Sequence, residues 1–149
     1  MTVAIPISFD AIATKLNRRV DDVVKTIAME LFGSVIDKTP VDTGRLRGNW
    51  FVSTGTFVAF SPDAPDPSGD KTRRYMQQSV LRMRMGEKIL MTNSLPYAAV
   101  VEYGQYPNPP KHPTGKTSGG YSIQAPAGMV RVSMQEITAQ LGTKFGQSL

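Results

Sequence analysis

The stretch from Ser8 to Lys38, SFDAIATKLNRRVDDVVKTIAMELFGSVIDK, carries the clearest structural signal in this chain of 149 residues. Ser8 is a suitable N-cap, and Asp10 lies in the first turn, where the helix dipole favours an acidic side chain. Pro40 ends the predicted helix, because the residue before a proline disfavours helical backbone geometry. Apolar residues recur at spacings of three and four, as in an amphipathic helix: Phe9, Ile12, Leu16, Val20, Val23, Ile27 and Leu31.

The second half of this predicted helix carries apolar residues on a second side, namely Ala28, Met29, Phe32 and Ile36. A continuous helix from residue 8 to 38 would be about 46 Å long. That length exceeds the diameter of about 38 Å expected for a compact domain of this size. Two interpretations follow: Gly33 bends the helix around one core, or the helix overhangs and packs against a neighbouring subunit.

The composition excludes several chemistries. The chain has no cysteine, which rules out disulfides, thiolate nucleophiles, iron–sulfur clusters and cysteine-liganded zinc. The single histidine, His112, cannot supply the imidazoles of a typical catalytic zinc site. No apolar run is long enough to span a membrane, and the N-terminus lacks the features of a signal peptide, so we expect a cytoplasmic site of synthesis and no membrane partner.

The middle of the chain begins with a turn at residues 39–44, where proline, aspartate and glycine serve different backbone needs. Asp42 is expected to accept hydrogen bonds from backbone amides there. Aromatic and β-branched residues then predict strands at residues 49–52 and 56–60, separated by a turn or bulge near Gly55. The proline-rich stretch 61–69 is a loop by composition.

Residues 70–86 allow two interpretations. Asp70 as N-cap and Gly86 beyond the C-terminus favour a helix, with a stripe of Met76, Val80 and Met83. The alternation of apolar and basic residues at 81–85 fits a hairpin instead. We favour the helix, because the residues before position 79 have no strand character.

The rest of the chain predicts a strand at 88–92, a turn at 93–96 and a short apolar segment at 97–103. Residues 105–120 form a long polar, proline-rich loop, of the kind that is usually functional or disordered. A last helical stripe runs from Val130 to Phe145. The fold class is therefore α+β in one domain over residues 1–149, with a long N-terminal helix, a small mostly antiparallel sheet, a middle helix and a C-terminal helix.

No group of residues resembles an active site, so we expect no enzyme, no metal and no cofactor. Gly115-Lys116-Thr117 matches the end of a P-loop, but Pro110 stands where its first glycine belongs. The net charge of +5 points to an anionic neighbour. Its main source is a basic segment that either forms a solvated surface or contacts DNA: Lys71, Arg73, Arg74, Arg82, Arg84 and Lys88. A small nucleic-acid-binding module that uses this segment is the alternative function.

Three motifs together resemble a known family. They are TPVDTGRLR at 39–47, TNSLPYA at 92–98 with VEYG at 101–104, and QAPAGMVR at 124–131. In this order they resemble signatures of the neck and tail-completion proteins of long-tailed bacteriophages, a family similar to the minor tail protein Z of lambdoid phages. The insertion between Gly104 and Tyr121 is longer than in that pattern.

The resemblance implies a structural virion protein without catalysis, a tail-completion or neck component at the head–tail junction. It implies a homo-oligomeric ring, sixfold to match the tail, around the DNA passage. The implied partners are other neck and tail proteins (tail terminator, connector or stopper, tail tube), with non-specific contact to passing DNA.

The motif residues are expected to act as scaffold or interface residues: Thr39, Pro40, Asp42, Thr43, Gly44, Leu46, Asn93, Pro96, Tyr97, Glu102, Gly104, Gln124 and Pro126. For Glu102 three partners are open: Arg45 or Arg47 of the same subunit, or a basic residue across the ring.

Overall fold

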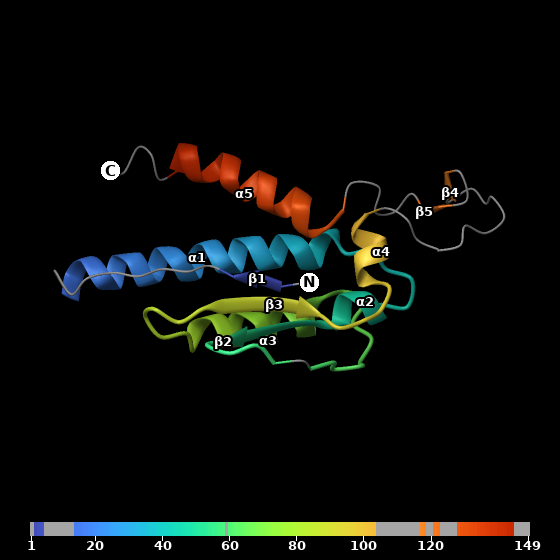
Figure 1. Ribbon diagram of the computed structural model, residues 1–149, viewed down its shortest axis with the longest axis horizontal. Helices are drawn as coiled ribbons and strands as arrows, with labels where there is room; N and C mark the ends of the chain where they lie inside the picture. Colours follow the sequence, from blue (N-terminus) through green and yellow to red (C-terminus); the bar gives the residue numbers. More distant parts are fainter. Residues whose placement is uncertain are drawn as a thin grey trace.

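A computed structural model describes residues 2–4, 14–58, 60–103, 117–118, 121–122 and 128–144. The elements in chain order are β1 (Thr2–Ala4), α1 (Thr14–Lys38), α2 (Arg45–Gly48), β2 (Trp50–Thr54), α3 (Asp70–Leu81), β3 (Ile89–Asn93), α4 (Ala98–Glu102), β4 (Thr117–Ser118), β5 (Tyr121–Ser122) and α5 (Val130–Lys144). This arrangement confirms the predicted α+β class, with a long N-terminal helix and a C-terminal helix (Figure 1).

The main sheet has three antiparallel strands in the order β1-β3-β2. Its central strand is β3, in which Thr92 lies opposite Thr2 on one side and Phe51 on the other. The strand β2 therefore forms one edge of the sheet. The short strands β4 and β5 pair with each other in a separate two-stranded sheet, which lies near α4 at one end of the molecule (Figure 1).

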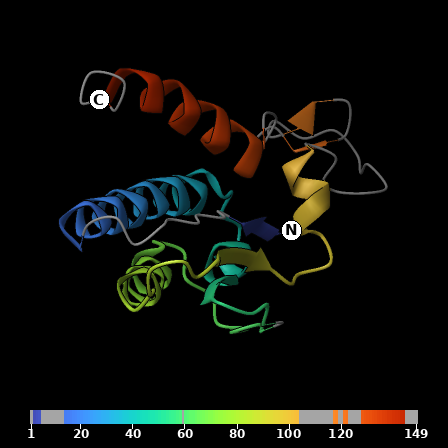
Figure 2. The same cartoon turned by 60° about the vertical axis from the view of Figure 1, so that its left-hand side comes forward.

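The three longest helices, α1, α3 and α5, lie one after another across the molecule. Helices α1 and α3 pack against each other, α3 also packs against β2, and α5 packs on the side of α1 away from α3 (Figures 1 and 2). The second half of α1 is consequently buried on two sides, as its apolar residues predict. The second side is covered by α5 of the same chain.

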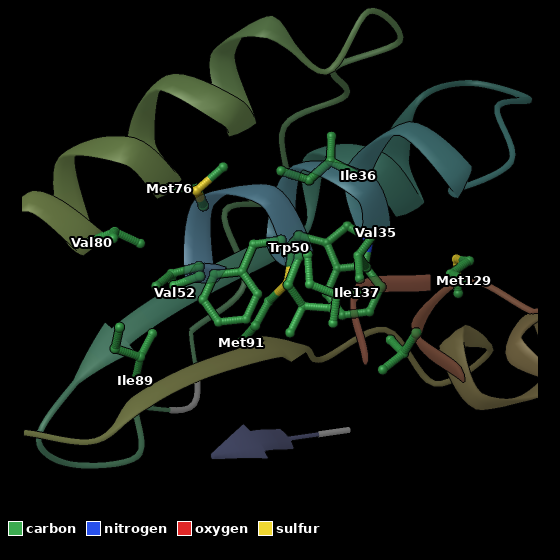
Figure 3. Packing of buried hydrophobic residues seen from close by; sticks show 14 of the residues in the cluster. Val35, Ile36, Trp50, Val52, Met76, Val80, Ile89, Met91, Met129 and Ile137 are labelled. Carbon is green, nitrogen blue, oxygen red and sulfur yellow. The ribbon is translucent and has the colours of Figure 1, made fainter. Parts of the chain in front are cut away.

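The core lies between the sheet and helices α1 and α3 (Figure 3). Alternate residues of β2 and β3 point into it, including Trp50, Val52, Ile89 and Met91. They meet apolar side chains of α1 and α3, and Ile137 of α5 extends the cluster to the third layer. Burying one side chain of this size contributes about 1.5–3 kcal/mol to folding.

Helix α1 continues through Gly33 without a break and ends at Lys38, close to Pro40 as predicted. Its 25 residues correspond to about 37 Å. A Cβ on Gly33 would lie 3.1 Å from Nη1 of Arg73, so this glycine permits the close approach of α3. The predicted helix start at Ser8 lies outside the described residues.

The interpretation of residues 70–86 as a helix is confirmed for Asp70–Leu81, and the hairpin is wrong. The helix begins at Asp70, so its N-cap is Gly69 and not Asp70. Gly69 has a φ of 80°, a conformation open to glycine. The helix ends at Leu81, before the predicted boundary, and Gly86 occupies a later turn at φ 83°. The predicted strand at 88–92 is present one residue further on.

The predicted strand at residues 56–60 is wrong, because no described residue of that segment is in a strand. The amide of Gly55 still bonds to the carbonyl of Lys88 at 2.8 Å, and the chain then leaves β3. A sequence of strand-forming residues becomes a strand only where it finds a pairing partner. Strand β1 is an element that the sequence reasoning missed, and the loop at 105–120 lies mostly outside the described residues.

Candidate functional site

The first motif begins with a buried threonine that joins α1 to β2. The Thr39 hydroxyl donates to the carbonyl of Val35 at 2.7 Å and accepts the indole N–H of Trp50 at 2.8 Å. Thr39 is 1% exposed, so both hydrogen bonds lie in the core. This side chain satisfies the tryptophan donor and fixes the direction in which the chain leaves α1.

Gly44 sits at the closest approach between the first motif and the loop that leads into α3. Its φ is 86°, and its carbonyl accepts the amides of Gly48 at 2.9 Å and Asp66 at 3.0 Å. A Cβ at this position would lie 2.5 Å from the backbone nitrogen of Pro67. The position therefore requires glycine for two reasons: its positive φ, and the lack of space for a Cβ beside the backbone of Pro67.

The remaining turn residues of the first motif are less enclosed. Pro40 is half-buried, and Asp42 and Thr43 are exposed. The side chain that accepts a backbone amide here is Thr43, whose hydroxyl takes the N–H of Arg45 at 3.3 Å. Asp42, for which that role was expected, has no such bond among the described residues.

Arg47 binds three backbone carbonyls at the end of α1 and the start of α3. Its guanidinium donates to the carbonyls of Pro67 at 2.6 Å, Thr39 at 2.8 Å and Asp37 at 3.2 Å. Carbonyls near a helix C-terminus carry partial negative charge, which favours a cation. This arginine therefore connects the end of α1 to the loop that leads into α3.

The second motif begins with Asn93, which joins the end of β3 to α2. Its amide nitrogen donates to the carbonyl of Leu46 at 2.9 Å, and its oxygen accepts the amide of Leu95 at 3.2 Å. Asn49, which is fully buried, donates to the same oxygen at 3.4 Å and accepts Ser61 at 2.6 Å. The first two motifs are thus connected through a buried polar network.

Pro96 and Tyr97 form the turn between β3 and α4. Pro96 is exposed, whereas Tyr97 is partly buried and packs against the core. The segment after them, which the sequence defined only as apolar, is the short helix α4. Its buried residues orient its last residue, Glu102, toward α5.

Glu102 is a fully buried carboxylate that caps the N-terminus of α5. Its Oε2 accepts the amides of Met129 at 2.7 Å and Val130 at 2.9 Å, and its Oε1 accepts the amide of Arg131 at 2.9 Å. The first amides of a helix lack partners within the helix, and they bind anions well. The second and third motifs therefore meet at one buried joint.

Two further contacts complete the joint at Glu102. The Arg131 Nε lies 3.3 Å from Oε1 of Glu102, and its guanidinium stacks 4.6 Å from the ring centre of Tyr103. Gly128 has φ 91°, and a Cβ there would lie 2.6 Å from the carbonyl oxygen of Glu102. The ion-pair partner of Glu102 in this subunit is thus Arg131, and not Arg45 or Arg47.

Three motif residues, Gly104, Gln124 and Pro126, lie outside the described residues. Arg45 pairs with Asp63 at 3.0 Å on the surface. The joint's two other contributors, Arg131 and Tyr103, were not singled out from the sequence. The sequence gives little indication of these two roles, because nothing near an exposed arginine identifies the aromatic ring on which it stacks.

Asp66 caps the N-terminus of α3 in a similar way. Its Oδ2 accepts both the amide and the hydroxyl of Thr72 at 2.7 Å. Burial acts to raise the pKa of Asp66, but hydrogen bonds from Thr72, Gly69 and Ser68 outweigh it and hold that pKa below the usual value. Sequence reasoning placed Asp66 only within a loop.

The lowered pKa of Asp66 predicts a pH-dependent contribution to stability. A carboxyl group whose pKa is lowered by folding stabilises the protein above its unfolded pKa of about 3.9, and this contribution disappears as the pH falls through the folded pKa. We expect Asp66→Asn to lower the urea midpoint clearly at pH 6 and much less at pH 2.5. Asp63→Asn, in the same loop but exposed, is the control and should change the midpoint little. An Asp66→Asn effect that is equal at both pH values would contradict this prediction.

The basic segment does not form one continuous surface. Arg73 is paired with Asp37 of α1, which takes it out of any cationic patch. The other five cations are exposed, but Lys71 and Arg82 line a groove beside β2, whereas Arg74, Arg84 and Lys88 lie outside that lining. The spacing of charges in the sequence did not reveal this division.

That groove has a volume of about 490 Å³ and lies between β2, α3 and residues 60–66. Its lining includes four aromatic residues and the two cations Lys71 and Arg82, with Asp66 as its acidic residue. The rings of Phe51 and Phe60 are 5.0 Å apart. The groove therefore suits a ligand with apolar groups and negative charge.

Metal-ligating side chains do not gather in the described ranges. No three histidine, aspartate or glutamate residues there converge in a way that would hold a metal ion. The helices of this part also lack the length and hydropathy needed to cross a bilayer. His112 lies outside the described residues.

The model of one protein family, described as "Bacteriophage HK97-gp10, putative tail-component", matches residues 5–104 of the chain. No curated protein and no solved structure gave a significant match. The matched range covers well over half of the chain and contains the first two motifs, including Gly44, Asn93 and Glu102. The chain therefore belongs to the HK97-gp10-like family of bacteriophage tail components.

Proposed function

We propose that this chain is a tail-completion or neck component that closes into a ring, sixfold like the tail, at the head–tail junction around the DNA passage. Membership of the tail-component family carries the coarser part of this statement: a structural, non-enzymatic virion protein that contacts other tail proteins. The ring and its position are the proposal.

The observation that supports a ring is an apolar segment that the subunit leaves uncovered. Phe57, Val58 and Phe60 are 59%, 43% and 50% exposed, although they follow an edge strand and have strand-forming sequence. Adjacent exposed apolar side chains usually mark an interaction surface. A closed ring is built from two different surfaces on each subunit, and this segment is one candidate.

The motif residues support a stable subunit rather than the contact surface itself. Thr39, Gly44, Asn93 and Glu102 are buried and make their hydrogen bonds within the chain. We assign them to the scaffold that holds the exposed segment in place. The exposed cations Arg74, Arg84 and Lys88 are candidates to face passing DNA without reading its sequence.

Electron microscopy of tails incubated with the purified protein tests this function. We expect wild-type protein to add ring-shaped density at the head-proximal end of tails that lack it. Phe57→Ser combined with Val58→Ser should abolish the ring, because it removes apolar area that only a neighbouring subunit would bury.

Met134→Ser is the matched control, since Met134 is also exposed but lies on α5, on the other side of α1. It should leave the ring intact. Both variants should fold, as judged by circular dichroism. Tails that bind only single copies, or density away from the head-proximal end, would overturn the proposal.

A further inference from the structure

The free edge of β2 opens into the groove described above. Strand β2 is hydrogen-bonded to β3 on one side, and in the described part of the sheet no strand lies on its other side. Because Gly55 bonds to Lys88 and backbone groups alternate along a strand, Trp50 and Val52 direct their N–H and C=O groups toward the free edge. Both residues line the groove.

We propose that this groove binds an extended acidic segment of another tail protein, which adds to β2 as a fourth strand of the sheet. The proposal goes beyond the ring, because a subunit that never closes into a ring would present the same edge. Addition of a strand to an open edge is a common mode of peptide recognition, in which backbone hydrogen bonds supply affinity.

The walls of the groove suit the side chains of an added strand. Its lining combines Phe60 and Pro62 of the segment after β2, Tyr75 and Met76 of α3, and Phe51 of β2. Side chains of an added strand alternate between the two faces of the sheet. Those on the α3 face would meet Tyr75, and those on the opposite face would meet the Phe51–Phe60 pair.

The charge of the groove defines the charge of its ligand. Lys71, Tyr75, Gln78 and Arg82 follow one another at spacings of four, three and four along α3, which places them on one face of the helix. Asp66 is the carboxylate among the lining residues, and its Oδ2 is bound by Thr72. The groove therefore offers two cations whose attraction favours an acidic ligand.

The sequence argues against a second copy of this chain as the ligand. Residues 104–127, which join α4 to α5, contain no aspartate or glutamate, neither do residues 145–149, and residues 5–13 contain a single acid, Asp10. The adjacent acidic pair Asp21 and Asp22 lies within α1, so it is not available as a strand. Charge complementarity thus points to a different protein, in agreement with the contacts expected of a tail component.

The open strand edge also favours a peptide over nucleic acid. It presents donors and acceptors in alternation, and a second peptide backbone satisfies both. A phosphate backbone offers acceptors without amide donors and would leave the carbonyls of the edge unpaired. Two cations would also give only a small electrostatic contribution to DNA binding.

Fluorescence anisotropy with a labelled peptide tests the site. The probe is a capped peptide of about eight alternating glutamate and valine residues, a typical strand length. We expect saturable binding that weakens at least about tenfold in Lys71→Glu combined with Arg82→Glu, because close charge pairs contribute on this scale. Methylation of alternate amide nitrogens in the peptide should abolish binding, since it removes donors without changing charge.

Arg84→Glu combined with Lys88→Glu is the matched control. It changes the same residue types and the same net charge at exposed positions outside the groove lining, and it should bind the peptide nearly as well as the wild type. All four substitutions are at exposed positions, so urea midpoints should confirm that both variants fold.

Three outcomes would overturn the proposal. Equal weakening in both double variants would indicate attraction by net charge alone. Binding of a short DNA duplex that depends on Lys71 and Arg82, without binding of the peptide, would assign the groove to nucleic acid. Self-association lost in the groove variant, without peptide binding, would assign it to a second copy. These experiments need no tails, so their failure is distinct from failure of the ring.

Discussion

Replacing Glu102 with alanine is expected to lower the free energy of unfolding by about 4 kcal/mol. The substitution leaves three amides at the start of α5 without their acceptor: that of Met129, just before the helix, and those of Val130 and Arg131. It also empties a fully buried site next to Met129. The expected consequence is that α5 detaches from α4 before the rest of the chain unfolds.

Urea denaturation gives the stability change, and hydrogen exchange at the amides of residues 129–131 reports on the joint itself. Glu102→Gln keeps one carbonyl oxygen and should be less harmful than alanine. The control is Glu136→Gln, which removes the surface ion pair with Lys38 at 2.6 Å and should cost less than about 1 kcal/mol. Similar effects for Glu102→Ala and Glu136→Gln would show that the carboxylate does not hold α5.

Gly44→Ala is expected to cost about 3–5 kcal/mol, because two unfavourable terms add. One is the left-handed backbone conformation at φ 86°, and the other is overlap with the backbone of Pro67 at 2.5 Å. A shift of Pro67 would in turn disturb the carbonyl that binds Arg47. The loop that leads into α3 therefore cannot simply move away.

Gly86→Ala separates the cost of the backbone conformation from the cost of the contact with Pro67. Gly86 has a nearly identical φ of 83°, but a Cβ there would meet nothing within 4 Å. We expect it to cost only the backbone term of about 1–2 kcal/mol. The difference between the two midpoints in urea measures the contact with Pro67, and equal midpoints would rule that contact out as a source of specificity.

The helices could be predicted from the sequence because their signals are local. The period of apolar residues identified α1, α3 and α5, and Pro40 fixed the end of α1. Residues 56–60 show the limit of this reasoning. Their side chains favour a strand, but a strand also needs a neighbouring strand to pair with. The chain turns away from β3 after Gly55, so residues 56–60 have no such neighbour in the described part of the sheet.

The candidate site was accessible to sequence reasoning only in part. The motifs indicated that Gly44, Asn93 and Glu102 matter, yet they did not reveal that Glu102 binds the first turn of α5. That contact joins residues 27 to 29 positions apart through backbone amides, which carry no sequence signature. The groove was missed for a related reason, since it is formed by the edge of a strand and the face of a helix that are distant in sequence.

The joint at Glu102 has a consequence for how the chain can vary. Its carboxylate lies within the matched family range, whereas α5 lies beyond it. The carboxylate accepts hydrogen bonds from backbone amides, which every residue except proline can donate. Apart from Arg131, this contact therefore does not depend on which side chains follow Gly128. Burial does make a demand, because Met129, Ser133 and Ile137 pack against the rest of the chain, so that substitutions which keep this anchor are expected on the exposed side of α5.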